Sequence, residues 1–504
     1  MEIRRSRLLN TNSDERLKLE VNAGKMRPDS KNYANRASPL PSGLTKSKII
    51  SQWLESLPSK LPWIFLLFGI PTVIFLAVCT PPFQSPDEWT HFARSYQVSN
   101  RGFYGGDGGY IDPGMVQAGS YYLPLEHGSN VKLTAAADAA GMSVRWGGPK
   151  VYSSFPNTST NPPIGYIPQA SAVIVGRVIG LSVVKTLILC RLFNGTVALF
   201  ISALSIYWCR RGKLAMFALL LMPMSISLFA SCSQDASLIS VTALTFALIS
   251  RQFTLGLPFS WRSTSLLAAA LLFVMLERPP YAPLLLVLYL PGLLPRWRKS
   301  SPSAIGIGLA CLILALTAIW WLGASSSKRM VLNSHPNATV DASLQLQYVV
   351  HHPMIIPVVT RNLARQGASY AVEIIGNLGW LDAPMPKPYY LIMGTAFLLA
   401  LTGELAFGGR SSFRATALIL SSAVLAVAAI VIIEYLTWTP VGSVTEEGLQ
   451  GRYLIPPIIA FGVGLPCLIR SGWLYRWATA IVVLSQFATS LYLPLLIIDR
   501  YYLR

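Results

Sequence analysis

Apolar runs separated by short polar segments recur along most of the chain. A helix needs roughly 20 apolar residues to cross the hydrocarbon core of a bilayer, so the pattern predicts membrane-spanning helices. About twelve candidate runs lie near residues 61–80, 164–182, 187–208, 214–231, 235–252, 263–277, 281–295, 303–323, 388–408, 413–437, 453–469 and 477–498. Residues 1–60 are instead polar and rich in Asn, Ser and basic residues, which predicts a disordered basic tail. The run that begins near Leu61 is expected to be a retained signal anchor.

Basic residues between the runs decide which runs cross. Lys and Arg favour the cytoplasmic side of a membrane segment. If all twelve runs cross and the tail is cytoplasmic, five basic clusters lie outside; if the 164–182 run does not cross, all five lie inside. The clusters are Arg210, Arg211 and Lys213; Arg251 and Arg262; Arg296, Arg298 and Lys299; Arg410 and Arg414; and Arg470 and Arg476. The pattern therefore favours eleven spans.

The sequence of the 164–182 run supports this interpretation. It follows two prolines and contains Gln169 and Arg177, which suit a helix in the membrane interface better than one in hydrocarbon. The predicted fold is an all-α polytopic membrane protein with about 11 transmembrane helices over residues 61–504. Its large outer loops are 81–186 and 324–387, each with interfacial helices, and a shorter outer segment covers 438–452. The N-terminus is then cytoplasmic and the active face external.

Composition agrees with a membrane protein. Hydrophobic residues make up 52% of the chain and charged residues only 12%, about half the share in a soluble protein. The net charge of +19 comes largely from clusters at the ends of apolar runs, so it gives little reason to expect nucleic-acid binding. Six scattered cysteines show no CxxC spacing, and no P-loop motif is present.

Candidate catalytic residues follow the first span, in TPPFQSPDEWTHFARSYQ. Asp87 and Glu88 lie just beyond the expected hydrocarbon edge, where Pro86 restricts the chain. Asp87, His91 and Arg94 have the spacing of one helical face, which makes an active-site strip plausible. The alternative is an ordinary interfacial helix with Asp87 as its N-cap and Arg94 reaching toward headgroups.

Further charges lie at the predicted outer ends of later spans. Asp235 follows one external turn, Arg278 lies in LERPPYAP, and Arg452 lies in LQGRYLIPP. Each could be an anchor at the membrane boundary, where a charge is tolerated. Arg binds phosphate in a bidentate manner, so Arg278 and Arg452 are candidates for a lipid phosphate. We expect these three residues to meet Asp87 and Glu88 at one level just outside the bilayer.

The remaining outer-face candidates are Gln450 and the GNLGWLDAP segment with Trp380 and Asp382. Trp380 suits the interfacial belt. No cofactor is certain. A divalent metal is possible on Asp87, Glu88 and His91, although the two acids could equally be a base and its support.

Over roughly residues 80–460 the chain resembles the bacterial domain-of-unknown-function family 2142. The resemblance rests on six motifs, which occur in this order: PDE..HF.R.Y, NPPIGY.P, S.SQD, RPPY, G.LGWLDAP.P and QGRYLIPP. That family in turn resembles the GT-C class of membrane glycosyltransferases, which use polyprenyl-phosphate or pyrophosphate sugars. Singly these motifs are weak, and their order carries the resemblance. This sequence has Arg278 where the family often has Lys.

The resemblance implies a function. Asp87, with Glu88 second, would be the catalytic base, and the donor phosphate would contact Arg278, Tyr281, Arg452 and Tyr453. The partners would be a polyprenyl-phosphate-linked sugar and a cell-envelope glycan or lipid acceptor. The location would be the bacterial cytoplasmic (inner) membrane. A flippase or transporter of lipid-linked sugars, and a polysaccharide polymerase or ligase, are the alternatives.

Overall fold

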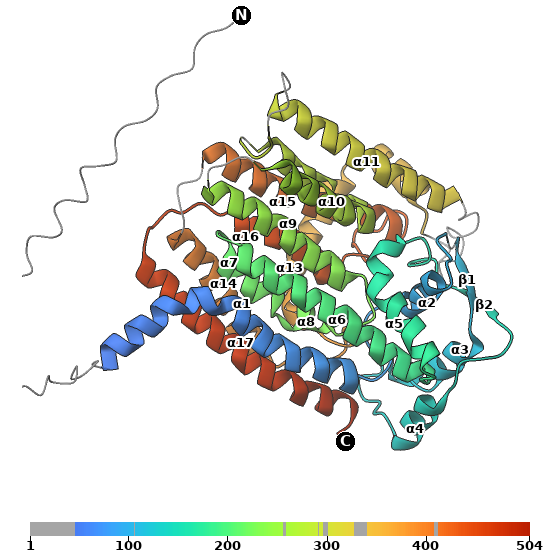
Figure 1. The fold of residues 1–504 in the computed structure, drawn as a ribbon. Helices are drawn as coiled ribbons and strands as arrows, with labels where there is room; N and C mark the ends of the chain where they lie inside the picture. Colours follow the sequence, from blue (N-terminus) through green and yellow to red (C-terminus); the bar gives the residue numbers. More distant parts are fainter. Residues whose placement is uncertain are drawn as a thin grey trace, which may run out of the picture. The chain divides into compact units, whose positions relative to one another are not determined.

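Long helices dominate the computed structural model, which describes residues 46–104, 106–255, 259–290, 292–295, 301–326, 340–407 and 412–503. Residues 51–504 form one unit, within which the helices run alongside one another (Figure 1). The first helix already begins at Lys46, so residues 46–60, which were predicted to be disordered, are helical. Residues 1–45 of that tail, and the basic residues Arg296, Arg298, Lys299 and Arg410, lie outside the described residues.

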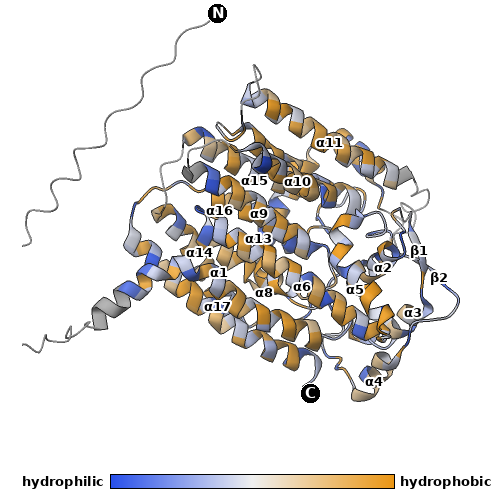
Figure 2. Ribbon diagram, viewed as in Figure 1, coloured by the Kyte–Doolittle hydropathy of each residue, from blue (hydrophilic) through white to orange (hydrophobic). Residues whose placement is uncertain are grey.

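Six described helices are long and apolar enough to cross a membrane, judged by length and composition. They coincide with six of the eleven expected spans, and apolar residues cover much of their length (Figure 2). They are α1 (Lys46–Cys79), α6 (Val183–Trp208), α11 (Pro302–Ser326), α14 (Lys387–Ala406), α15 (Phe413–Trp438) and α17 (Gly472–Tyr501). The multi-pass membrane architecture is thereby supported, while the count of eleven stays a prediction.

The other five expected spans form shorter or more polar elements. These are α7 (Lys213–Leu220) with α8 (Pro223–Phe229), α9 (Asp235–Leu255), α10 (Trp261–Glu277), the 3-10 helix η3 (Pro279–Tyr289) and α16 (Ile455–Gly464). The run 214–231 is broken because Pro223 has no N–H to donate and holds Met222 in an extended conformation, with ψ 146°. Both fragments are almost wholly buried, as interrupted helices inside membranes must be.

The 164–182 run does not form one long helix. It folds as η2 (Pro163–Tyr166) followed by α5 (Ile167–Val178). Twelve helical residues span only about 18 Å, well short of the roughly 30 Å hydrocarbon core. Its location in the interface stays a prediction.

The first predicted outer loop adds small elements to α5, and these gather at one end of the bundle (Figure 1). They are α2 (Glu88–Ser99), α3 (Pro113–Ser120), η1 (Leu123–Leu125), α4 (Ala135–Ser143) and the antiparallel strands β1 (Gly108–Ile111) and β2 (Val151–Ser154). The strands are a small departure from the predicted all-α fold. Later loops contribute α12 (Ala342–His351), α13 (Ile355–Gly376) and η5 (Gly451–Leu454).

The end of α17 lies against the first loop. The Arg500 guanidinium donates to the backbone carbonyls of Leu125, Gly128 and Val131, and the Tyr502 hydroxyl donates to the carbonyl of Cys79 at the end of α1. The C-terminal end of α17 therefore lies on the same side of the bundle as the C-terminal end of α1. An odd number of crossings has this property, and the count of eleven stays a prediction.

Candidate functional site

Asp87 lies in a strained turn between α1 and α2. Its backbone is left-handed, with φ 59° and ψ 11°, a conformation that costs a residue with a side chain about 1–2 kcal/mol. Asp87 occupies the N-cap position of α2, as the simpler interpretation expects, yet its carboxylate makes no capping hydrogen bond. It accepts instead from Asn157 at 3.2 Å and Arg452 at 2.5 Å. Strain of this kind is often found at functional sites.

Four of the five charges expected to meet do so. The Arg452 guanidinium lies 2.5 Å from Asp87 Oδ2 and 3.5 Å from Asp235 Oδ2. Asp235 Oδ1 in turn lies 3.8 Å from Arg278. Glu434, which the sequence analysis did not single out, extends the chain of ion pairs at 3.9 Å from Arg278. We call these five residues the ionic network.

The ionic network is exposed mainly at Asp87. The side chain of Arg452 is 3% exposed, whereas that of Asp87 is 32% exposed. Burial alone would raise the pKa of the Asp87 carboxyl, but the positive charges of Arg452 and Arg278 and the hydrogen bond from Arg452 outweigh it and hold the pKa below its ordinary value. Asp87 is therefore an ionised, accessible carboxylate at neutral pH.

Arg278 has unused hydrogen-bond donors. Its guanidinium carbon lies 3.6 Å from the centre of the Tyr453 ring, a cation–π contact. The Tyr281 hydroxyl donates to the backbone carbonyl of Tyr453 at 2.9 Å and so helps to hold Tyr453 in place. Among the described residues, the Arg278 guanidinium donates no hydrogen bond shorter than 3.5 Å, because its two acidic neighbours stand farther away. A planar guanidinium with free donors, 19% exposed, is suited to bind an oxyanion.

Glu88 lies apart from the ionic network, in a buried ion pair of its own. Its carboxylate pairs with Arg191 of α6 at 2.6 Å, and both side chains are 0% exposed. It also accepts from the backbone N–H groups of Phe83 and Cys232. Glu88 thus holds α1, α2, α6 and the α8–α9 turn together, and it cannot reach a substrate. The geometry argues against Glu88 as a catalytic base and leaves Asp87.

His91 and Arg94 also point into the protein. The His91 ring contacts the Tyr166 hydroxyl at 2.7 Å and Ser233 at 3.4 Å, and burial lowers its pKa despite the nearby Asp235 and Asp87 carboxylates. Arg94 is fully buried and donates to three backbone carbonyls, those of Asn161, Gly102 and Phe103. These two residues organise the first loop beneath Asp87.

The possible metal set is not assembled. Asp87 faces Arg452, Glu88 faces Arg191 and His91 faces Tyr166. No group of three His, Cys, Asp or Glu side chains suited to a metal occurs among the described residues. The three-residue set proposed from the sequence is therefore separated by the fold.

Three further candidates, two from the second loop and Gln450 from the shorter outer segment, lie outside the ionic network. Trp380 Nε1 donates to the Phe83 carbonyl at 3.0 Å, and Asp382 pairs with Arg500 at 2.6 Å. Gln450 adjoins η5, and its side-chain oxygen is buried without a partner among the described residues. Among the residues that the structure describes, none of the three forms an ion pair or side-chain hydrogen bond with the ionic network.

Helix α13 fixes the position of Arg452. Glu373 of α13 accepts from the Gly451 N–H at 2.7 Å, and Tyr370 donates to Glu446 at 3.2 Å. Sequence reasoning missed Glu373, Asn157 and Tyr166, because none of them lies beside a charged residue in the sequence. The NPPIGY motif was the one signal that pointed to Tyr166.

Replacing Gly451 with Ala is expected to destabilise the protein by about 1–3 kcal/mol. A Cβ at this position would lie 2.7 Å from the Tyr370 carbonyl oxygen and 2.8 Å from the Ile374 nitrogen, so α13 and η5 would have to separate. Gly367→Ala in α13 is the control, since its Cβ would meet nothing within 4 Å. It should be neutral or slightly stabilising. Thermal unfolding of both variants in detergent measures the difference, and equal melting temperatures would contradict the expectation.

Comparison with known proteins identifies a family but no activity. No curated protein and no solved structure matches the chain. A family described as "Predicted membrane protein (DUF2142)" matches residues 70–461 of the chain. This range includes every residue of the ionic network. The chain therefore belongs to the DUF2142 family of predicted membrane proteins.

Proposed function

We propose that this protein is a membrane glycosyltransferase of the GT-C type. It transfers a sugar from a polyprenyl-phosphate donor to a glycan or lipid acceptor of the cell envelope, on the outer face of the bacterial cytoplasmic membrane. One observation carries the proposal: an ionised, accessible carboxylate and a guanidinium with free donors are joined through a buried Arg452–Asp235 pair. A base and an anion-binding group are what sugar transfer from a lipid phosphate requires.

Asp87 acts as the general base. The acceptor hydroxyl gives its proton to the Asp87 carboxylate as its oxygen bonds to C1 of the sugar. The bond from C1 to the phosphate oxygen breaks at the same time, and the polyprenyl phosphate leaves with the electron pair. Arg452 and Asn157 hold the two carboxylate oxygens and so fix the direction of proton transfer.

Arg278 binds the phosphate of the donor. Its ring contact with Tyr453 orients the guanidinium plane, and its donors are free to form a bidentate contact. Negative charge grows on the phosphate as the sugar leaves, and a fixed cation stabilises that charge without reorganisation. Arg452 is already bound by two carboxylates, so its main role is to hold Asp87 and Asp235.

The direct test uses purified protein in liposomes with a labelled polyprenyl-phosphate sugar and a mixture of envelope acceptors. Transfer of label from the lipid to an acceptor supports the proposal. Movement of the lipid-linked sugar across the bilayer without transfer would overturn it in favour of a flippase. Transfer of whole preassembled glycan chains, with no single-sugar transfer, would favour a polymerase or ligase.

Replacing Arg278 with Met is expected to raise KM for the lipid-linked donor by about 10–100-fold, since a charge-assisted hydrogen bond contributes about 1.5–3 kcal/mol. Arg278→Lys should fall between wild type and Arg278→Met, because it keeps the charge and loses the planar fork. The control is Arg361→Met, which removes an exposed positive charge from α13 in the second loop. Steady-state kinetics at varied donor concentration measure the effect. Equal donor KM values for Arg278→Met and wild type would refute the assignment.

A further inference from the structure

Two cysteines that are far apart in the sequence lie side by side in the fold. Cys190 belongs to α6, and Cys232 lies in the turn between α8 and α9. Both side chains are 0% exposed, and both are thiols in this structure. A side-chain hydrogen bond joins the two thiols. The spacing of the cysteines in the sequence does not predict this pair, because packing alone brings the turn to α6.

Hydrogen bonds on either side of Cys232 hold it against α6. Asn194 lies one helical turn after Cys190, and its side-chain nitrogen donates to the backbone carbonyls of Ser231 and Ser233 at 2.8 and 2.9 Å. These two carbonyls flank Cys232, and both hydrogen bonds are buried. The backbone position of Cys232 is therefore fixed by the same face of α6 that carries Cys190.

Helix α5 contacts the pair from a second direction. The backbone carbonyl of Gln169 accepts from the Cys190 thiol at 3.3 Å. The side-chain nitrogen of Gln169 donates to the Ser233 carbonyl at 3.1 Å. One residue of α5 thus contacts both Cys190 and the residue that follows Cys232. The two cysteines are held together by three elements of the fold and do not depend on their own weak thiol contacts.

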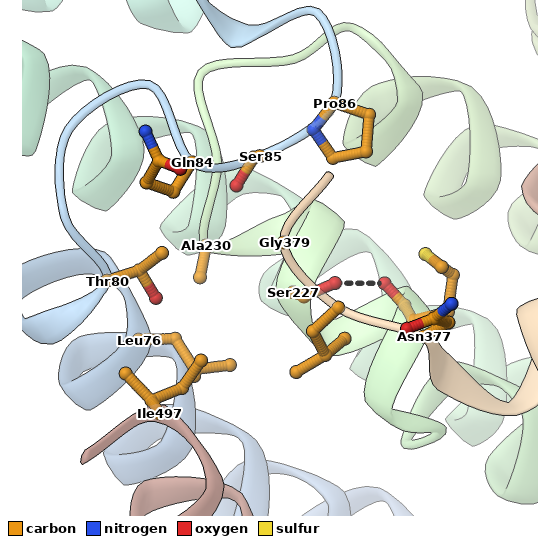
Figure 3. Close-up of a pocket in the computed structure, with 12 residues that line it drawn as sticks. Leu76, Thr80, Gln84, Ser85, Pro86, Ser227, Ala230, Asn377, Gly379 and Ile497 are labelled. Atoms are coloured by element: carbon orange, nitrogen blue, oxygen red, sulfur yellow. Dashed lines mark hydrogen bonds between the residues drawn. The ribbon is translucent and has the colours of Figure 1, made fainter. Parts of the chain in front are cut away.

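The backbones of α6 and the turn come close to each other. A Cβ on Gly195 of α6 would lie only 3.0 Å from the Phe229 carbonyl oxygen at the end of α8. Such an approach suits a disulfide, whose Cα atoms lie about 4.4–6.8 Å apart. The turn also borders a small cavity, which Ala230 lines together with Thr80 and Gln84 (Figure 3). Because the turn is not fully packed there, it can adjust as a bond forms.

We infer that Cys190 and Cys232 form a disulfide in the mature protein. The predicted topology places both on the outer side of the membrane, and disulfides form and persist in oxidising compartments outside the cytoplasm. Both S–H bonds break and one S–S bond forms, with loss of two protons and two electrons. The disulfide of an envelope thiol oxidase accepts them and becomes a dithiol. This inference rests on the predicted outer location and not on the proposed function.

The disulfide would fasten the turn that leads into the ionic network. Ser233, next to Cys232, contacts His91 at 3.4 Å, and Asp235 begins α9 directly after the turn. Neither sulfur forms a recorded contact with Asp87 or Arg278 among the described residues. We therefore expect the bond to stabilise the fold and to take no part in the chemistry.

The direct test is mass spectrometry of the full chain, purified from bacterial membranes without reductant. Free thiols are alkylated with N-ethylmaleimide in denaturant before digestion, so that only bonded cysteines escape. We expect a linked pair of peptides containing Cys190 and Cys232 in more than half of the molecules. Alkylation of both cysteines in most molecules would overturn the inference.

Cys79 is the internal control for this measurement. It lies at the end of α1, on the predicted outer side, and no contact with another cysteine is found for it among the described residues. It should be alkylated in full. A Cys79 that is linked as often as Cys190 would indicate random oxidation and would also overturn the inference.

A pair of variants provides a second, independent test. Cys190→Ala and Cys232→Ala each prevent the bond, and each should lower the melting temperature by about 4–10 °C without reductant. The double variant should melt within about 2 °C of the single variants, because either substitution already removes the bond. Losses that add in the double variant would mean two independent thiols and would refute the disulfide.

Cys209→Ala is the matched control, since Cys209 is a buried thiol at the other end of α6. It measures the cost of removing a buried thiol alone, and its melting temperature should fall by less than that of either variant of the pair. Sugar transfer enters none of these measurements. Failure of the proposed function would therefore leave the disulfide unaffected, and absence of the disulfide would leave the proposed function unaffected.

Discussion

Sugar transfer by Asp87→Asn is expected to be at least about 100-fold slower than by the wild type, because a general base contributes about 10²–10⁴-fold. The amide has nearly the same shape as the carboxylate, and its oxygen can still accept from Arg452. It cannot take the proton of the acceptor hydroxyl. The loss should therefore appear in kcat, with donor KM little changed, in the liposome transfer assay.

The control is Asp499→Asn, which neutralises an exposed acid near the end of α17. Transfer at wild-type rate by Asp87→Asn would remove Asp87 as the base. The pH profile adds a second readout. Since neighbouring charges hold the Asp87 pKa below its ordinary value of 3.8, the carboxylate stays ionised as the pH is lowered until that range is reached. The wild-type rate should lose this base only as pH falls below 3.8.

Glu88→Gln is expected to reduce the free energy of unfolding by about 3–5 kcal/mol, the usual cost of leaving one partner of a buried ion pair alone. The Phe83 and Cys232 N–H groups bond to different oxygens of Glu88, so the single Gln oxygen can accept from only one of them. The Arg191 charge then also has no counterion at 0% exposure. Low yield and a much lower melting temperature are the expected observations. The fraction that does fold should retain most of its specific activity.

Arg476→Met provides the matched comparison. It breaks the pair of Arg476 with Glu55, which has the same 2.6 Å separation but exposed side chains. Solvent screens such pairs, so the expected loss is at most about 1 kcal/mol. A Glu88→Gln protein with wild-type stability and no transfer activity would contradict this account and return Glu88 to the catalytic site.

The span pattern was predicted well where a helix faces lipid and poorly where it lies inside the bundle. α11 and α15 carry uninterrupted apolar sequence, so length and hydropathy identify them. The 214–231 run is equally apolar, yet it breaks at Pro223 into α7 and α8. A buried segment can satisfy its backbone groups through neighbouring elements, and hydropathy does not record that possibility.

The sequence by itself determined that this is a multi-pass membrane protein, and the predicted topology indicated that Asp87, Glu88, Asp235, Arg278 and Arg452 would meet at one level, as all but Glu88 do. The positions of the charges in the sequence were sufficient for this prediction, because ionisable groups are largely confined to the ends of membrane spans. Only the tertiary structure decided what each charge does. Asp87 and Glu88 are neighbours in the chain, but the start of α2 turns one toward Arg452 and the other toward Arg191. Those arginines lie more than 100 residues away in α6 and η5, and partners so distant are chosen by packing, not by local sequence.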